Sequence, residues 1–466
     1  MDTIATTCRG RVRGRVRDGV AAYLGIPYAA APFGAHRFRA PAPVEPWEGV
    51  RDALEFGSTA PQRPYRPPLD QLIPEVDILG EEYLNLNVWT PEPDDGPLPV
   101  MVWIHGGSLR NGSAAMPLYD GRAFARDGVV LVSINYRLGI EGFGVFPDAP
   151  DNRGLLDQIA ALTWVRDNIA AFGGDPGAVT VCGESAGAVS VAALMTSPRA
   201  AGLFHRAILQ SGPPQTVSRK EGAKAVHAMA KVLRVPATAE AFAGVARERL
   251  LDAQDEVVGR ADPISGGPGF HIVVDDDVVP ADPPLPSVDL LLGCNREEYR
   301  LWFVPSGVVD RVGGLTLRLA LLKFRIPGRV ARLYRATRPD AKPGVILGEI
   351  ATDLLLRGPL NRLADSRPAR TFLYEFAWRS PVLGLGACHA LEIGFVFDNL
   401  RHGEALTGPG APQPLADIMH RAWVDFVTSA DPGWDAWDTR RPVMVFDDPS
   451  RGTVLSPRQE ELQPWL

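Results

Sequence analysis

The sequence predicts an α/β fold with a mostly parallel central sheet and helices on both faces. Two apolar segments, 98–107 and 129–136, are rich in β-branched residues and end in polar or glycine-containing turns. This pattern is typical of parallel strands buried on both faces. After them, apolar residues recur at spacings of three and four from Leu155 to Phe172, which predicts a helix with one apolar face. Strand and helix patterns therefore alternate, as a covered parallel sheet requires.

Later segments extend this alternation along the chain. We expect further strands at 178–183, 206–211, 288–293 and 371–376, and a small-residue helix at 186–195. The segment from about 300 to 360 is mainly helical in pattern, and we interpret it as an insertion that flanks the entrance of a site. The proline-rich pieces are short and are typical of surface loops rather than linkers. We therefore predict one domain over residues 1–466.

The composition is that of an ordinary globular protein. The chain has 466 residues, of which 45% are hydrophobic and 22% charged, and its formal net charge is -7. This charge predicts neither nucleic acid nor an anionic membrane as a partner, and no apolar run approaches the ~18 residues of a membrane span. A local exception is a row of arginines at alternate positions, which we expect on one solvated face of a strand or hairpin: Arg9, Arg11, Arg13, Arg15 and Arg17.

The cysteines predict neither a metal site nor a disulfide scaffold. Cys8, Cys182, Cys294 and Cys388 have no metal-ligand spacing and are too few for a scaffold in a chain this long. We expect the three that lie near candidate catalytic residues, Cys182, Cys294 and Cys388, to be small buried hydrophobes, and we expect no metal and no cofactor. The N-terminal residues also lack the apolar run of a signal peptide. Together these features predict a reducing, cytoplasmic location.

Residues 183–187, Gly-Glu-Ser-Ala-Gly, have the Gly-x-Ser-x-Gly spacing of a nucleophile elbow. The motif is short, but a predicted strand precedes Ser185 and a predicted helix follows it. That strand would bring the serine to the carboxyl edge of the sheet, and the helix start would aim N–H groups at developing negative charge. The context therefore favours Ser185 as a nucleophile.

A serine nucleophile needs a base to take its proton and an acid to orient that base. In an α/β-hydrolase the chain order is serine, acid, histidine, which excludes the two histidines upstream of the elbow. Among the others, His389 is best placed, in the loop after the last strand predicted above. Glu297 and Glu298 both follow the preceding strand. The pattern alone does not choose between these two carboxylates.

A turn upstream of the elbow supplies candidate groups for stabilising an oxyanion. His105, Gly106, Gly107 and Ser108 follow the first predicted strand. Such a turn lets backbone N–H groups approach a substrate carbonyl oxygen, together with the N–H of Ala186 after the nucleophile.

Several segments, in this order, resemble the type-B carboxylesterases, an α/β-hydrolase family that includes para-nitrobenzyl esterases, carboxylesterases and cholinesterases. The matching segments are LGIPYAAAPFGAHRFRAP, YLNLNVWTP, VMVWIHGG, VSINYRLG, NRGLLDQIAALTWVRDNIAAFGGDP, GESAG, LFHRAILQSG and ACHALEIGFVF. They span nearly the whole chain, which makes the resemblance specific.

The resemblance implies a catalytic triad. By analogy with the family, Ser185 is the nucleophile, and His389 is the general base and later the general acid. The family's acid loop, a glycine followed after three residues by Asp-Glu-Gly, falls on Gly293 to Tyr299 and selects Glu298 as the acid.

The resemblance also implies the oxyanion donors, which are the N–H groups of Gly107, Ser108 and Ala186. Ser211 matches a supporting serine of the family. Ser108 stands where the family usually has glycine or alanine, and Leu109 where it usually has an aromatic residue. The backbone donor survives this change, but we expect the added hydroxymethyl group to narrow the pocket or to add a hydrogen bond.

Other positions depart from the family pattern or extend it. Ala60 and Tyr83 occupy the two positions of a disulfide that the family often has, which supports folding in a reducing compartment. Tyr299 and Ala390 replace glycines that follow the acid and the histidine, and we expect them to affect the substrate range more than the reaction. Trp302 aligns with a family aromatic residue and is a candidate pocket wall.

These observations predict a serine carboxylesterase that hydrolyses small-molecule esters through an acyl-enzyme, as a monomer or homodimer. The alternative is an acyltransferase, cyclase or other non-hydrolytic enzyme of specialised metabolism on the same fold, which the altered wall at Ser108 and Leu109 motivates. A non-enzymatic adhesion protein is disfavoured because all three triad positions are filled.

Overall fold

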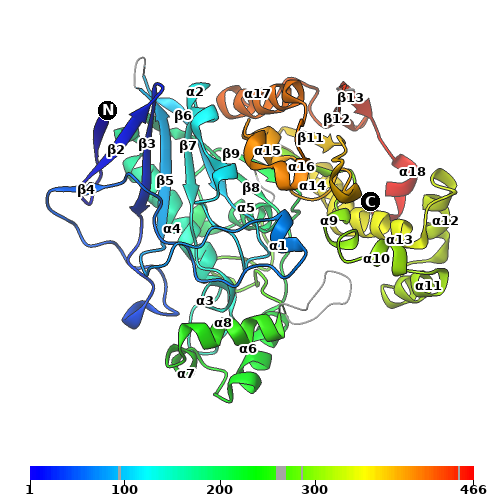
Figure 1. Cartoon of the computed structure of the whole chain (residues 1–466), viewed down its shortest axis with the longest axis horizontal. Coiled ribbons are helices and arrows are strands. Elements are labelled where there is room, and N and C mark those ends of the chain that lie inside the picture. Colours follow the sequence, from blue (N-terminus) through cyan, green and yellow to red (C-terminus); the bar gives the residue numbers. More distant parts are fainter. Residues whose placement is uncertain (93–95, 259–268, 285–286, 450–451) are drawn as a thin grey trace.

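A computed structural model describes residues 1–92, 96–258, 269–284, 287–449 and 452–466. In this part of the chain the strands form one sheet, in the order β1-β2-β3-β5-β7-β6-β8-β9-β10-β11-β12-β13, with β4 beside β2. The sheet crosses the molecule from the N-terminal strands on the left of Figure 1 to β12 and β13 on the right. The strands are β1 (Asp2–Thr6), β2 (Arg11–Arg17), β3 (Val20–Pro27), β4 (Val50–Asp52), β5 (Asn85–Pro91), β6 (Leu98–Ile104), β7 (Val130–Ile134), β8 (Gly174–Glu184), β9 (Arg206–Gln210), β10 (Asp289–Asn295), β11 (Thr371–Phe376), β12 (Pro442–Phe446) and β13 (Gly452–Leu455).

Helices fill most of the connections between these strands. They are α1 (Leu69–Leu72), α2 (Arg122–Arg126), α3 (Gly139–Phe143), α4 (Arg153–Asn168), α5 (Ala186–Leu194), α6 (Arg219–Leu233), α7 (Ala239–Ala243), α8 (Arg247–Val257), α9 (Arg300–Phe303), α10 (Val308–Arg311), α11 (Gly314–Lys323), α12 (Gly328–Thr337), α13 (Pro343–Thr352), α14 (Gly358–Ser366), α15 (Ile393–Val396), α16 (Glu404–Thr407), α17 (Gln413–Ser429) and α18 (Gln459–Leu462). Each strand and helix predicted from the sequence is present within a few residues of its expected bounds, so the predicted α/β architecture is confirmed.

The central strands, from β7 through β6, β8, β9, β10 and β11 to β12, pair in parallel, and antiparallel strands flank them. Alternate residues of each strand enter opposite cores, because successive side chains of a strand point to opposite faces. In β6, Val100 and Val102 pack in the core that contains residues of α4 and α6. Met101 and Trp103 pack in the core that contains residues of α2 and α17. This double burial explains the unbroken apolar run that the sequence shows.

Parallel pairing also brings the carboxyl ends of β6, β8, β9, β10 and β11 to one edge of the sheet. His105, Ser185 and Ser211 each come directly after one of these strands. Glu298 lies three residues beyond β10, and His389 lies in the loop that follows β11. The topology therefore gathers the predicted site residues at one edge.

The N-terminal arginine row is only partly a strand face. Arg11, Arg15 and Arg17 are exposed along β2 while Val12 between them is buried. Arg9, however, precedes the strand in a turn closed by a hydrogen bond from Thr7 N to the carbonyl of Gly10, at 2.9 Å. The row therefore lies on a hairpin, with Arg9 in the turn between β1 and β2 and the other four arginines in β2.

The segment from 300 to 366 is helical, as its pattern predicts, and comprises α9 to α14 with a π-helical turn at Asp353–Arg357. Its helices have a hydrophobic cluster of their own, which includes Tyr299, Leu317, Tyr334 and Ile346. This segment lies at the right-hand end of the molecule in Figure 1, beside the C-terminal helix α18. Its status as an insertion that flanks a site entrance stays a prediction.

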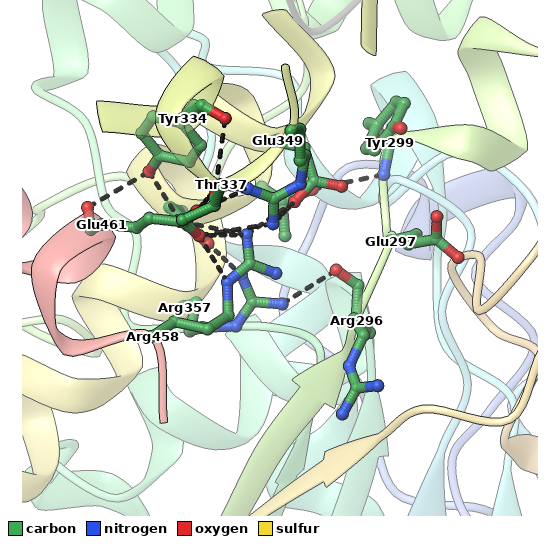
Figure 2. Close-up of polar contacts among 12 residues, drawn as sticks. Arg296, Glu297, Tyr299, Tyr334, Thr337, Glu349, Arg357, Arg458 and Glu461 are labelled. Atoms are coloured by element: carbon green, nitrogen blue, oxygen red, sulfur yellow. Dashed lines mark hydrogen bonds and ion pairs between the residues drawn. The ribbon is translucent and has the colours of Figure 1, made fainter. Parts of the chain in front are cut away.

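Buried charges join this helical segment to the sheet and to the C-terminal residues (Figure 2). Arg357 pairs with Asp353, lies 3.4 Å from Glu375 of β11, and donates to the carbonyl of Arg296 at 2.9 Å. Arg458, beside α18, lies 2.6 Å from Glu349 of α13. A buried charge is tolerated only where an opposite charge and hydrogen bonds compensate for the loss of water.

Removing Arg357 is therefore expected to destabilise the fold strongly. Arg357→Met leaves Asp353 buried without its main cation and removes one of two arginines from Glu375, and we expect it to lower the free energy of unfolding by about 3–5 kcal/mol. Urea unfolding followed by tryptophan fluorescence measures the change. The matched control is Arg421→Met, which removes a cation whose side chain is 71% exposed beside Asp425 and should cost under about 1 kcal/mol. Equal losses in the two variants would contradict the assigned role of the buried cluster.

Candidate active site

Ser185 lies at the junction of β8 and α5 with φ 54° and ψ -122°, a conformation that non-glycine residues rarely adopt. Its N–H donates to the carbonyl of Gln210 at the end of β9, at 2.8 Å. Such strain persists only where the surroundings enforce it, and it is frequent at functional positions.

Two glycines make this turn possible. A Cβ atom on Gly187 would lie 2.0 Å from the carbonyl oxygen of Ile104, and one on Gly183 would lie 2.5 Å from the backbone of Gly187. Real Cβ atoms do not approach other atoms this closely. Both glycines of the sequence motif are therefore required where β6, β8 and α5 meet.

His389 is held by Glu298. The distance from His389 Nδ1 to Glu298 Oε2 is 2.5 Å, and the other Glu298 oxygen accepts a hydrogen bond from Asn295 N at 2.7 Å. Glu297 faces another way, because its carboxylate accepts from Ala387 N at 3.1 Å and pairs with Arg379 at 3.1 Å. Geometry thus separates two adjacent carboxylates that the sequence pattern leaves equivalent.

Ser185 follows β8 and His389 follows β11 at the same edge of the sheet, and no hydrogen bond joins their side chains among the described residues. His389 Nε2 lies 3.1 Å from Glu184 Oε1, but Glu184 Oε1 forms no hydrogen bond among the described residues. Glu184 is the residue directly before Ser185. Catalytic hydrogen bonds are often long or misaligned before substrate binds and tighten in the enzyme–substrate complex.

The His-Gly-Gly-Ser turn packs directly against the elbow. A Cβ atom on Gly106 would lie 2.9 Å from the carbonyl oxygen of Glu184 and 3.1 Å from Ser185 Cβ, so glycine suits this close approach. Throughout the described chain, the N–H groups of Gly107, Ser108 and Ala186 donate to no protein acceptor. Three free donors beside a strained serine are what stabilisation of an oxyanion requires.

Comparison with known proteins agrees with this geometry. Residues 1–312 match the model of the carboxylesterase family. The para-nitrobenzyl esterase of Bacillus subtilis is 38% identical, with 95% of this chain and 94% of that protein covered, and the phenmedipham hydrolase of Pseudarthrobacter oxydans is 37% identical, with 96% and 94% covered. This chain belongs to the carboxylesterase family. It is a carboxylic ester hydrolase, as the sequence predicts.

Solved structures of this family share the whole architecture. A thermophilic para-nitrobenzyl esterase superposes with a TM-score of 0.88 at 35% identity, and a carboxylesterase of Geobacillus stearothermophilus does so with 0.88 at 34%, in each case over 100% of both chains. The α/β-hydrolase fold of this carboxylesterase is thereby established.

Sequence reasoning missed a buried polar network under His389. Glu392 is fully buried, and its two oxygens accept from Asn295 Nδ2 at 2.6 Å and Gln210 Nε2 at 3.1 Å. Asn295 also donates to the carbonyl of Cys388, next to the histidine, at 2.7 Å. Two features of the sequence point to this network. Glu392 follows His389 by three residues, and Glu184 directly precedes the serine in the Gly-x-Ser-x-Gly motif.

These carboxylates control the charge of His389. Burial lowers the pKa of His389, but the carboxylates of Glu184 and Glu298 outweigh this effect and raise the pKa above its usual 6.5. Burial raises the pKa of Glu184, while His389 opposes that change. His105, in contrast, has only burial as its main influence, which lowers its pKa to about 4 and keeps it neutral at pH 7.

Other residues singled out in the sequence have distinct surroundings. Trp302 lies against His389, with ring centroids 4.8 Å apart, so its predicted place in a pocket wall fits the geometry. Ser211 is buried after β9, and its hydroxyl has no hydrogen-bond partner among the described residues. Ser108 is exposed, whereas Leu109 is buried in the core beside it.

The positions that depart from the family have structural explanations. Tyr299 is buried in the cluster of the helical segment and packs on Phe303. Ala390 has φ 65°, which explains why glycine is common at this position. Ala60 and Tyr83, at the disulfide positions of the family, are both buried in the core.

The pH dependence of catalysis should reveal the contact with Glu184. Only neutral His389 can accept the serine proton, so kcat/KM falls as pH drops through the pKa of His389. Glu184→Gln removes a carboxylate that raises this pKa, and we expect the acid limb to move about 1 pH unit or more toward lower pH. A pH profile of p-nitrophenyl butyrate hydrolysis measures it. Glu297→Gln, the matched control, should leave the position of the limb unchanged, and the same shift in both variants would contradict the assignment.

Proposed function

We propose that Ser185, His389 and Glu298 form the catalytic triad of this carboxylesterase. The observation that carries the proposal is the 2.5 Å contact between His389 Nδ1 and Glu298 Oε2, beside the strained elbow of Ser185. An acid on Nδ1 fixes the tautomer in which Nε2 is free to accept a proton, and stabilises the imidazolium that forms.

In the proposed mechanism, Ser185 Oγ attacks the ester carbonyl carbon as His389 takes its proton. The N–H groups of Gly107, Ser108 and Ala186 bind the oxyanion of the tetrahedral intermediate. Protonated His389 then gives its proton to the leaving alcohol, and the acyl group remains on Ser185. Water, deprotonated by His389, attacks this ester, and collapse of the second intermediate releases the carboxylic acid and regenerates the serine.

The proposed substrate is a small ester whose acyl or alcohol group contacts Ser108 and Trp302. The names of the relatives support small esters of aromatic alcohols, since one is a para-nitrobenzyl esterase. Ser108 is the exposed member of the unusual pair at 108 and 109. We therefore assign it, rather than buried Leu109, to the border of the bound ester.

We also propose that the enzyme acts in the reducing cytoplasm, without a nucleic-acid partner, as a monomer or homodimer. The location is supported by the four cysteines, which are free in the described chain although three of them are buried. Burial raises the pKa of the Cys182, Cys294 and Cys388 thiols, which suits inert packing groups rather than reactive thiols.

Replacement of the nucleophile tests the mechanism most directly. Ser185→Ala removes the attacking oxygen, and we expect hydrolysis of p-nitrophenyl butyrate to fall by at least about 10⁴-fold and labelling by a fluorophosphonate probe to disappear. Circular dichroism should show an unchanged fold. Ser211→Ala is the control, because it removes a nearby hydroxyl but should keep probe labelling. Hydrolysis that persists in the Ser185 variant would overturn the proposal.

The choice of acid is tested by comparing two adjacent residues. Glu298→Gln deprives His389 of its ion-pair partner, and we expect kcat to fall by about 10²- to 10⁴-fold. Glu297→Gln changes a carboxylate that contacts Arg379 and the backbone of Ala387, so the loss should stay below about tenfold. Steady-state kinetics on one soluble ester gives both values. A larger loss at Glu297 would mean that the acid is misassigned.

A further inference from the structure

Helix α11 is apolar on two opposite sides. Leu317 and Leu321 are buried and pack in the cluster of the helical segment. Leu315, Leu319 and Leu322 are 71%, 58% and 74% exposed. At 100° per residue, these three leucines occupy an arc of about 60° on the far side of the helix. The inner pair already attaches α11 to the protein, so folding does not account for the outer three.

Cations flank this outer face. Arg318 and Lys323 fall on either side of the leucine arc by the same helical spacing. Phe324, the residue directly after α11, is 40% exposed, with Lys323 Nζ 5.5 Å from its ring centroid, and exposed Arg325 follows. Long cationic side chains beside exposed apolar ones can lie along an interface with their charges in the polar layer.

The charge of this region is opposite to that of the chain as a whole. Residues 311–339 contain eight Arg or Lys and no Asp or Glu, in a protein with a net charge of -7. Arg338 faces inward to Glu349 and Glu461, but Arg329 and Arg332 are exposed on α12. Helices α11 and α12 lie together at the right-hand edge of the molecule (Figure 1). The edge therefore combines a leucine face with concentrated positive charge.

We propose that this edge is a docking surface for anionic phospholipid bilayers, with α11 lying in the membrane interface. An exposed leucine face with cations beside it binds a bilayer by burying apolar area and by attraction to anionic headgroups. Among the described residues no helix is long and apolar enough to cross a membrane, so the contact is peripheral.

Charge and apolar exposure together select this partner over two others. A second copy of the chain, docked through the same face, would bring two sets of like charges together. The phosphates of a nucleic acid would pair with the arginines. Its phosphate and sugar backbone would offer no apolar partner for the three exposed leucines. An anionic bilayer satisfies both components. The net charge of the whole chain is negative and does not reveal this local positive region. Composition alone therefore predicts no membrane partner.

Vesicle cosedimentation with the purified full chain tests the proposal. We expect binding to phosphatidylcholine vesicles that contain about a third phosphatidylglycerol, at least about tenfold weaker binding to pure phosphatidylcholine, and release at about 0.5 M salt. The triple variant Leu315→Gln, Leu319→Gln, Leu322→Gln and the triple variant Arg318→Gln, Arg325→Gln, Arg329→Gln should each bind at least about tenfold more weakly.

The matched control changes Arg11, Arg15 and Arg17 to Gln, since these exposed arginines lie on β2 at the opposite end of the molecule. This variant should bind vesicles like the unmodified chain. All variants should hydrolyse soluble p-nitrophenyl butyrate at the unmodified rate without vesicles, which verifies that they fold.

Three results would overturn the proposal. The first is no preference for anionic vesicles, and the second is unchanged binding by the leucine variant, which would show attraction through net charge alone. The third is a dimer that the leucine substitutions dissociate, or an oligonucleotide complex that depends on the arginines but not on the leucines. The dimer would identify this edge as a contact between two copies of the chain, and the oligonucleotide complex would identify it as a nucleic-acid surface.

Discussion

The approach of α5 to the end of β6 is the constraint on which the site depends. Gly187 packs so closely on the carbonyl of Ile104 that a Cβ would lie 2.0 Å from it. The parallel register of Ile104 with Gly183 places the end of β6 beside the end of β8. Ser185 is therefore forced into a positive φ at the sheet edge, and the turn after Ile104 is forced against it. One backbone contact positions both the nucleophile and the neighbouring free N–H groups.

A second constraint is the separation of charges around the acid loop. On one side of residues 295–298, Glu298 faces His389, and Glu184 and Glu392 lie nearby. On the other side, Arg357 donates to the carbonyls of Asn295 and Arg296. The arginine thus holds the backbone of the acid loop without adding a cation next to the imidazole. This arrangement preserves the negative surroundings that raise the pKa of His389.

The fold can be predicted well from the sequence because buried segments have a recognisable residue pattern. Strands covered on both faces appear as continuous apolar runs, and the glycines of the serine motif reflect contacts that exclude a Cβ. The network around Glu392 has no such sequence pattern, because the residue type alone does not show whether a glutamate is buried or solvated. Choosing Glu298 over Glu297 likewise depends on where each side chain points, which the residue type does not encode. Family resemblance supplied that choice, and the distances to His389 give its physical reason.

The helical segment links the site to the outer surface of the enzyme. Trp302 of α9 lies against His389, while Tyr299 and Phe303 on either side of it pack in the cluster that also holds the inner leucines of α11. Glycine at 348 accommodates this packing, because a Cβ there would lie 2.0 Å from the Tyr299 ring. Tyr299, which directly follows Glu298, thereby packs α13 against the start of α9. One hydrophobic cluster thus joins the Trp302 side chain, which contacts His389, to the inner leucines of α11.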